Sequence, residues 1–186
     1  MNRRTVLGGM AAAGALGGSL WFAMADSRFT TGANPDSDAE AAASRMAPQE
    51  IETLEAPGSS AGTLTVPVPG EVTVVDAFAT WCAPCREQMV QLNAAHDEVG
   101  GQARFVSVSN EAIGGDFKRS DVAEWWATHD GNWTVGLERQ GNVTSELRVS
   151  GLPFVAIVDA AGRITWTHQG VTDGTTLVER VEAALP

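Results

Sequence analysis

The only two cysteines of this 186-residue chain lie three positions apart, as Cys82 and Cys85, and this pair constrains the fold more than any other feature. The preceding residues, Glu71–Ala79, form an apolar, β-branched run with the length of a buried strand. The following residues have a helical pattern, because apolar side chains recur at intervals of three and four until Gly100. The two thiols are therefore predicted to lie where a buried strand passes the chain to the first turn of a helix.

This position at a helix N-terminus gives the two sulfurs different chemistry. Unpaired backbone N–H groups and the positive end of the helix dipole stabilise a thiolate there. Cys82, which comes first in the turn, is the predicted nucleophile and forms a mixed disulfide with a partner. Cys85, one turn inside the helix, is predicted to attack that mixed disulfide and release the product. The pattern therefore indicates a redox-active dithiol.

Other uses of the cysteines remain open from the residues alone. A structural zinc site needs four ligands, so it would have to recruit histidines from among His96, His129 and His168. A purely structural disulfide would close a loop so short that it stabilises little. A copper site would be expected to have a wider cysteine spacing and a matching histidine. These alternatives are less favoured because the chain has neither a second CxxC nor a CxxxC motif.

The chain from residue 61 onward alternates between strand and helix patterns. Besides the run before the cysteines, strands are predicted at Gly62–Val68, Ala103–Ser109, Asn132–Leu137, Pro153–Val158 and Arg163–His168. Helices are predicted at Ser120–His129, with a capping serine, at Asn142–Arg148 and at Thr175–Leu185. Pro67 and Pro69 confine the first strand to a sheet edge. The order favours an α/β domain, residues 61–186, whose central mixed β-sheet is flanked by helices on both faces.

Two adjacent tryptophans, Trp125 and Trp126, lie in the helix predicted at Ser120–His129. If both rings were exposed, they would form a surface for binding a partner. The favoured expectation is that one ring lies in the core and the other is half-buried, because large aromatic side chains gain most from burial.

The segment Val74–Cys85 (VVDAFATWCAPC) resembles the active-site segment of thioredoxin-fold proteins. The similarity extends from about Val72 to the C-terminus and is strongest to the exported TlpA/ResA-like thiol-disulfide oxidoreductases. It implies a thioredoxin-like fold in which Cys82 and Cys85 are the redox pair, and the segment Ser120–Leu137 matches an insertion typical of this branch. The resemblance implies no cofactor other than the redox-active Cys82–Cys85 disulfide.

The same resemblance assigns residues that would bind a protein substrate. Trp81 immediately precedes Cys82, and Pro84 lies between the two cysteines. Leu152 and Pro153 match a loop whose proline is cis and faces the disulfide, although an X-Pro bond is usually trans when judged from sequence alone. A cis bond there would allow the backbone of Leu152 to pair with an extended substrate segment beside Cys82.

Asp76 is the predicted proton carrier of the site. It lies among apolar residues of the strand that leads to the motif, where desolvation should raise the pKa of its carboxyl group. The resemblance implies that it exchanges a proton with Cys85, whereas the alternative is an aspartate that faces water. Some reductive relatives place a glutamate three residues after the second cysteine, but this chain has Gln88, whose amide cannot act as a base.

The N-terminal 25 residues are expected to be an export signal or a membrane anchor. Arg3 and Arg4 precede 21 uncharged residues, Thr5–Ala25, and resemble a twin-arginine export signal with a small-x-small cleavage site at Ala23–Ala25. Without cleavage the uncharged segment would extend about 31 Å as a helix, which is enough to cross a bilayer. Residues 26–60 are expected to be an acidic flexible tether with at most one short helix near Asp38–Met46.

The charge balance is strongly acidic. The formal net charge is −11, and once the two arginines of the export segment are set aside, 23 acidic residues face 10 basic ones. Only Lys118 is a lysine, which suggests a halophilic source; an ordinary acidic extracellular protein is the alternative. Nucleic-acid binding is excluded because it needs a basic face. Export would make the sequons at Asn132 and Asn142 available for glycosylation.

The sequence thus predicts an extracytoplasmic, monomeric thiol-disulfide oxidoreductase that acts on protein thiols and disulfides. The resemblance implies a reductive task, such as preparing apocytochrome thiols in cytochrome c maturation, with electrons supplied by a membrane donor. A disulfide-donating oxidase is one alternative. A non-catalytic, membrane-tethered binding module on the same fold is another.

Overall fold

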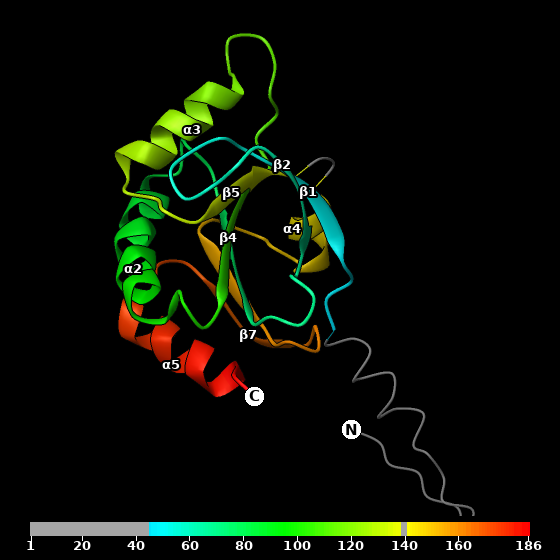
Figure 1. The fold of residues 1–186 in the computed structure, drawn as a ribbon. Coiled ribbons are helices and arrows are strands. Elements are labelled where there is room, and N and C mark those ends of the chain that lie inside the picture. Colours follow the sequence, from blue (N-terminus) through cyan, green and yellow to red (C-terminus); the bar gives the residue numbers. More distant parts are fainter. Residues whose placement is uncertain (1–44, 139–140) are drawn as a thin grey trace, which may run out of the picture. The chain divides into compact units, whose positions relative to one another are not determined.

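A computed structural model describes residues 45–138 and 141–186 of the chain (Figure 1). Within these residues, seven strands form one sheet in the order β2-β1-β5-β4-β3-β6-β7. The strands are β1 Gln49–Thr53, β2 Gly62–Val66, β3 Thr73–Phe78, β4 Arg104–Ser109, β5 Thr134–Leu137, β6 Phe154–Val158 and β7 Ile164–Gln169. The helices are α2 Ala83–Val99, α3 Arg119–Thr128, α4 Asn142–Glu146 and α5 Gly174–Ala184.

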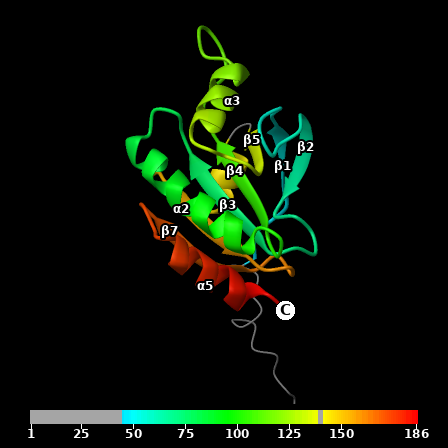
Figure 2. The same cartoon turned by 60° about the vertical axis from the view of Figure 1, so that its left-hand side comes forward.

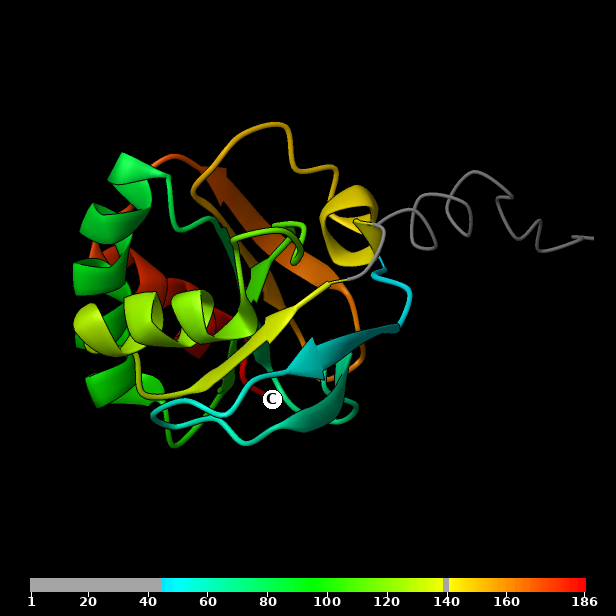
Figure 3. The ribbon, with the colours of Figure 1, turned by 90° about the horizontal axis from the view of Figure 1, so that it is seen from above.

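The sheet is mixed, as predicted. β3, β4 and β5 run parallel to one another, whereas β6 is antiparallel to β3 and β1 is antiparallel to β5. The view from above in Figure 3 shows α2, α3 and α5 on one side of the sheet and α4 on the other. Figure 2 shows α2 and α5 side by side on their shared face, where the two helices contact each other. The expected arrangement of a central mixed sheet with helices on both faces is therefore confirmed.

Alternating side chains of the central strands supply a separate core on each face of the sheet. Val74 and Phe78 of β3 pack with α2, α3 and α5, whereas Val75 and Ala77 pack with α4. This follows from the two-residue period of a strand, which sends neighbouring side chains to opposite faces. Because both faces are covered, β3 is buried along its whole length.

The two tryptophans of α3 have different environments. Trp126 is fully buried, and its Nε1–H donates to the carbonyl oxygen of Pro57 at 3.0 Å. Trp125 is partly buried and stacks on Phe78, with ring centroids 4.9 Å apart. The expectation of one core ring and one half-buried ring is therefore confirmed.

The folded domain begins earlier than the sequence predicted. β1 lies inside the segment 26–60, which was expected to be a tether, and it pairs with both β2 and β5. Ile51 of this strand is buried, and the Met46 N–H donates to the Gly162 carbonyl oxygen at 2.9 Å. The prediction of a domain start at residue 61 is wrong because Met46, Ile51 and Leu54, which are separated by mostly polar residues, are all buried in the core. Residues 1–44, including the expected export segment and most of the expected helix near Asp38–Met46, lie outside the described residues; Met46 itself is not helical.

Several element boundaries differ from the predictions by one or two residues, among them the starts of α3 and β5. α3 begins at Arg119, so Ser120 lies inside the helix and does not cap it; the Asp121 carboxylate instead accepts the Lys118 N–H at 2.7 Å. β5 begins at Thr134, after the backbone of Asn132 passes close to Gly58. A Cβ at Gly58, which has a φ of 71°, would lie 2.1 Å from the carbonyl carbon of Asn132, so the turn requires glycine. In the part of the chain that the structure describes, no helix has the length and apolar character needed to cross a membrane.

Candidate active site

The cysteine pair lies where β3 ends and α2 begins. The Cys82 N–H donates to the Ala79 carbonyl oxygen at 3.0 Å, which closes a turn after the strand. Ala83 is the first residue of α2, and Pro84 follows in its first turn, where the missing N–H of proline has no consequence. The Cys85 N–H donates to the Cys82 carbonyl oxygen at 3.1 Å, so the second cysteine already belongs to the helix. The pair therefore has the predicted placement at a helix N-terminus.

Cys82 and Cys85 form a disulfide. Both sulfur-bearing residues are buried, with Cys82 the slightly more exposed of the two. The neighbouring Trp81 is 74% exposed, and Pro84 is also exposed. Among the described residues, no group of three or more His, Cys, Asp and Glu side chains is placed to hold a metal ion. The disulfide therefore lies at the outer edge of the core, with the exposed indole of Trp81 beside it.

Asp76 lies on β3 and belongs to a buried chain of hydrogen bonds. The Ser107 hydroxyl donates to Asp76 Oδ2 at 2.8 Å, and the Trp133 Nε1–H donates to Ser107 Oγ at 3.0 Å. Because Ser107 Oγ accepts from the indole, its own hydrogen is directed toward the carboxyl group. Asp76 Oδ1 has no partner among the described residues. The network thus binds one oxygen of Asp76 and leaves the other available to a proton.

Burial determines the acidity of Asp76. The residue is only 2% exposed, so the alternative of an aspartate facing water is wrong. Desolvation raises its pKa from 3.8 to about 7, and the hydrogen bond from Ser107 acts in the opposite direction but more weakly. A carboxyl group that titrates near neutral pH is suited to both accepting and donating a proton.

Ser107→Ala is expected to raise the pKa of Asp76 further, because the variant loses the hydrogen bond that favours the ionised carboxylate. One hydrogen bond of this kind corresponds to roughly one pKa unit. An NMR titration of the Asp76 carboxyl carbon would measure the shift. Thr144→Ala is the matched control, because it removes a hydroxyl that donates to a different carboxylate, Glu138. An unchanged titration of Asp76 in Ser107→Ala would show that the hydroxyl does not stabilise the carboxylate.

The start of β6 lies at the same edge of the sheet as the disulfide. Phe154 pairs with Ala77, near the end of the strand that leads to the cysteines. The Leu152–Pro153 peptide bond is cis, as the family resemblance implied. The Pro153 carbonyl oxygen accepts the Gly170 N–H at 2.8 Å, whereas the backbone of Leu152 makes no hydrogen bond within the described residues. The polar backbone groups of Leu152 are therefore free to pair with another chain.

Gln88 lies where some relatives have a glutamate, and here it has a structural contact. It is buried on α2, and its Oε1 accepts the Thr172 N–H at 2.8 Å. Its Nε2 has no partner among the described residues. The side chain ties α2 to the segment before α5 and supplies no ionisable group, so Asp76 is the buried acid of the site.

Sequence reasoning missed Ser107, Trp133 and Glu111, all of which contact the site. Glu111 binds Thr80, two residues before Cys82. Ser107 lies within β4, between Val106 and Val108 and opposite Asp76 in the parallel register. A serine between two valines of a buried strand is the one local signal in the sequence; the partners of Trp133 and Glu111 depend on the fold.

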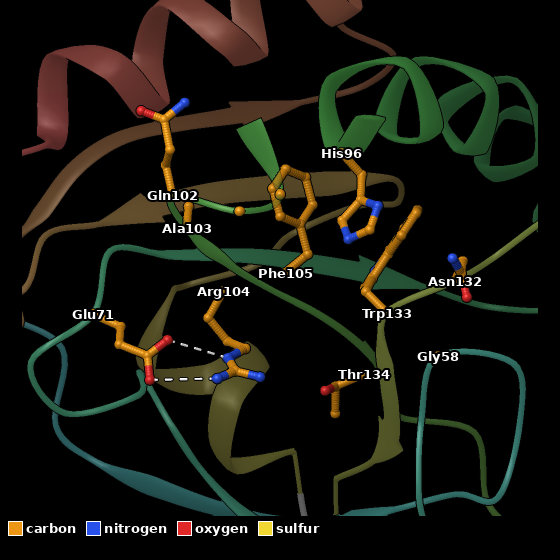
Figure 4. A pocket seen from close by; sticks show the side chains of 12 residues that line it. Gly58, Glu71, His96, Gln102, Ala103, Arg104, Phe105, Asn132, Trp133 and Thr134 are labelled. Atoms are coloured by element: carbon orange, nitrogen blue, oxygen red, sulfur yellow. Dashed lines mark hydrogen bonds and ion pairs between the residues drawn. The ribbon is translucent and has the colours of Figure 1, made fainter. Parts of the chain in front are cut away.

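A surface hollow of about 350 Å³ lies elsewhere and contains neither cysteine (Figure 4). It is lined in part by His96, Arg104 and Trp133, and Arg104 forms an ion pair with Glu71 at 3.2 Å at its rim. His96 lies 11 residues beyond Cys85 on α2, which is about 16 Å along the helix axis. The hollow is therefore separate from the redox pair, and only Trp133 belongs both to its wall and to the Asp76 network.

The fold and the site together define a thioredoxin-fold thiol-disulfide oxidoreductase. The family model described as Redoxin matches residues 41–185, and the chain belongs to this family. The thiol:disulfide interchange protein CycY of Rhizobium leguminosarum bv. viciae is 28% identical over 150 residues, which cover 80% of this chain and 70% of CycY. The thioredoxin-like protein YneN of Bacillus subtilis is 24% identical over 101 residues, or 54% of this chain and 58% of YneN.

A solved structure shows the same fold. The crystal structure of a thiol:disulfide interchange protein DsbE from Chlorobium tepidum superposes with a TM-score of 0.63 at 23% identity and covers 76% of this chain and 96% of its own. The predicted family resemblance, the thioredoxin-like fold and the class of enzyme are confirmed. Protein thiols and disulfides are the substrates of this class.

Proposed function

We propose that this protein reduces or exchanges disulfides in proteins outside the cytoplasm, in a task such as preparing apocytochrome thiols for cytochrome c maturation. The observation that supports a protein substrate is the exposed Trp81 ring next to the disulfide. In the described part of the chain, the exposed large hydrophobic side chains are Trp81, Val90 and Val171, at 74, 65 and 39%. Trp81 precedes Cys82, Val90 lies on α2, and Val171 follows the residue that binds Pro153. Of these three, Trp81 is adjacent in sequence to the reactive pair, and an exposed indole there suits contact with a protein partner.

The proposed reductive cycle begins with the dithiol form of the site. The Cys82 thiolate attacks one sulfur of a partner disulfide, a mixed disulfide forms, and the partner's other sulfur leaves as a thiolate that takes up a proton. Cys85 gives its proton to Asp76 and attacks Cys82 Sγ. The Cys82–Cys85 disulfide forms, the partner's second sulfur leaves, and Asp76 returns the proton. Two electrons pass from the dithiol to the partner, and the cysteine pair is the redox group, with no cofactor required.

Other residues would position the partner for this exchange. Trp81 and Pro84 are exposed beside the cysteines and would contact the segment that carries the substrate disulfide. The free backbone groups of Leu152, before Pro153, would pair with that segment in an extended conformation. This mode fixes the direction of the substrate chain without reading its side chains, which suits an enzyme that acts on several proteins.

The proposal places the domain outside the cytoplasm, acting as a monomer. The support is the arginine pair and the uncharged segment of the first 25 residues, which lie outside the described residues. A reductive role in that compartment needs an electron donor in the membrane. The excess of acidic residues supports a protein that stays hydrated in strong salt, in keeping with a halophilic source.

The reduction potential of the Cys82–Cys85 pair is the test of this function. We expect a value near −270 mV or below, in the range of thioredoxin, from thiol alkylation across a redox buffer series in high salt. A value near −120 mV would instead make the protein a disulfide donor, and the cytochrome-type task would be rejected. The absence of any reversible titration would contradict the redox function itself.

A further inference from the structure

The carboxylate of Glu111 binds the chain just before the redox pair. Glu111 follows β4, and its Oε2 accepts the Thr80 N–H at 2.7 Å, while its Oε1 accepts the Thr80 hydroxyl at 2.7 Å. The Ser109 hydroxyl also donates to Oε2, at 3.0 Å. Ser109 is the register partner of Phe78, so the carboxylate joins the ends of β3 and β4.

Thr80 occupies a critical place in the active-site turn. The turn runs from Ala79 to Cys82 and is closed by the Cys82 N–H bond to the Ala79 carbonyl oxygen. Thr80 and Trp81 are its two central residues. By binding both the backbone and the side chain of Thr80, Glu111 fixes the direction in which the turn presents the Trp81 ring and delivers Cys82 to the helix N-terminus.

The charge of Glu111 also bears on the sulfur. All three of its donors are neutral, so these hydrogen bonds satisfy the carboxylate without cancelling its charge. The Cα atoms of Thr80 and Cys82 are at most about 7.6 Å apart, because consecutive Cα atoms are separated by about 3.8 Å. The Glu111 carboxylate binds Thr80 and so lies beside the turn that ends at Cys82. A negative charge there disfavours a thiolate at Cys82, since like charges repel most strongly near a low-dielectric interior.

We propose that Glu111 is a positioning residue for the redox pair, which holds the Ala79–Cys82 turn through Thr80 and shifts the thiol-disulfide equilibrium toward the disulfide by its charge. The inference rests on the proposed function, because it supposes that the Cys82–Cys85 pair cycles. The family resemblance assigns no catalytic role to the loop after β4. In this proposal, Glu111 of that loop affects the reactivity of the cysteine pair.

The charge effect is tested with Glu111→Gln and the matched control Glu138→Gln. Glu138 lines the same surface hollow of about 340 Å³ as Glu111, but its carboxylate binds the N–H groups of Val143 and Thr144 at the start of α4. At pH 8, we expect Glu111→Gln to increase the equilibrium constant for oxidation of glutathione by the protein disulfide about fivefold. For two electrons, this corresponds to a reduction potential about 20 mV higher. The pH midpoint for alkylation of Cys82 should fall in the same variant. Equal values in the two variants would overturn the role of charge.

The positioning effect is tested from the other side of the contact. Thr80→Val removes the hydroxyl bond and keeps the charge, and Thr80→Ser restores the hydroxyl. We expect kcat/KM for a disulfide-bonded protein to fall severalfold in Thr80→Val and to recover in Thr80→Ser. The loss in the double variant Glu111→Gln/Thr80→Val should be smaller than the product of the single losses, because the two side chains act through one contact.

The outcomes separate this inference from the proposed function. If the wild type does not titrate reversibly, the function fails. If the wild type titrates but Thr80→Val has no effect, or if its loss and that of Glu111→Gln multiply in the double variant, positioning by Glu111 is wrong. Circular dichroism checks folding, and if Glu111→Gln does not fold, the Thr80 variants and their rescue by serine decide the question.

Discussion

Replacing Cys82 with serine is expected to abolish turnover, lowering kcat/KM for a disulfide-bonded protein by roughly three orders of magnitude or more. A serine hydroxyl is not ionised at neutral pH and cannot form the mixed disulfide through which the cysteine pair must act. The expected variant neither reduces its partner nor traps it. Turbidimetric reduction of a protein disulfide by dithiothreitol measures the loss of turnover.

Cys85→Ser is the matched comparison, since it removes the other sulfur of the same disulfide. Cys82 remains able to attack, but nothing resolves the product, so a mixed disulfide with the partner should accumulate to about one equivalent and appear on a non-reducing gel. If Cys82→Ser were the variant that trapped the partner, the order of the two cysteines would be reversed. Retention of full turnover by Cys82→Ser would contradict the assignment of the pair as catalytic.

The centre of the fold could be predicted because its signals are local. The apolar run before the cysteines and the helical pattern after them each lie within one continuous segment, and together they place Cys82 at the helix N-terminus. The burial of Asp76 follows in the same way from its apolar neighbours along β3. The cis bond before Pro153 came from the family resemblance and not from the residues, since a proline does not disclose its isomer.

The contacts that the sequence did not disclose are set by register between distant strands. Asp76 meets Ser107 across 31 residues, and Glu111 meets Thr80 across the same separation. Which residues face each other depends on how β3 and β4 align, and a shift of one residue would send Ser107 to the opposite face. β1 was missed for a related reason: its place is fixed by pairing with β2 and β5 and not by its own composition.

Asp76→Asn is expected to slow resolution of the mixed disulfide by about a hundredfold at pH 8, where the wild-type carboxylate is ionised and able to accept the proton of Cys85. Because burial raises the pKa of Asp76 to about 7, the wild-type rate should rise with pH through that value. The asparagine variant should lack this inflection. Stopped-flow tryptophan fluorescence across pH 5 to 9 measures both, and an inflection near 7 that persists in the variant would assign it to another group.

The same substitution should stabilise the oxidised protein at alkaline pH. The folded-state pKa of Asp76, about 7, exceeds the ordinary value of 3.8, so the folded state binds its proton more tightly than the unfolded chain does. Stability linked to this group is therefore fully present below pH 4 and is lost as the pH rises to about 7, by up to about 4 kcal/mol. Asparagine carries no charge and avoids this loss while still accepting the Ser107 hydrogen bond.

Urea unfolding at pH 5 and pH 8 measures this linkage. The gain in the free energy of unfolding from Asp76→Asn should be about 2 to 3 kcal/mol larger at pH 8 than at pH 5. Asp116→Asn, at an exposed aspartate, is the control and should show no such dependence on pH. A gain that was equal at the two pH values would mean that Asp76 is ionised throughout this range, and the carboxyl group could not then carry the proton between Cys85 and the departing thiolate.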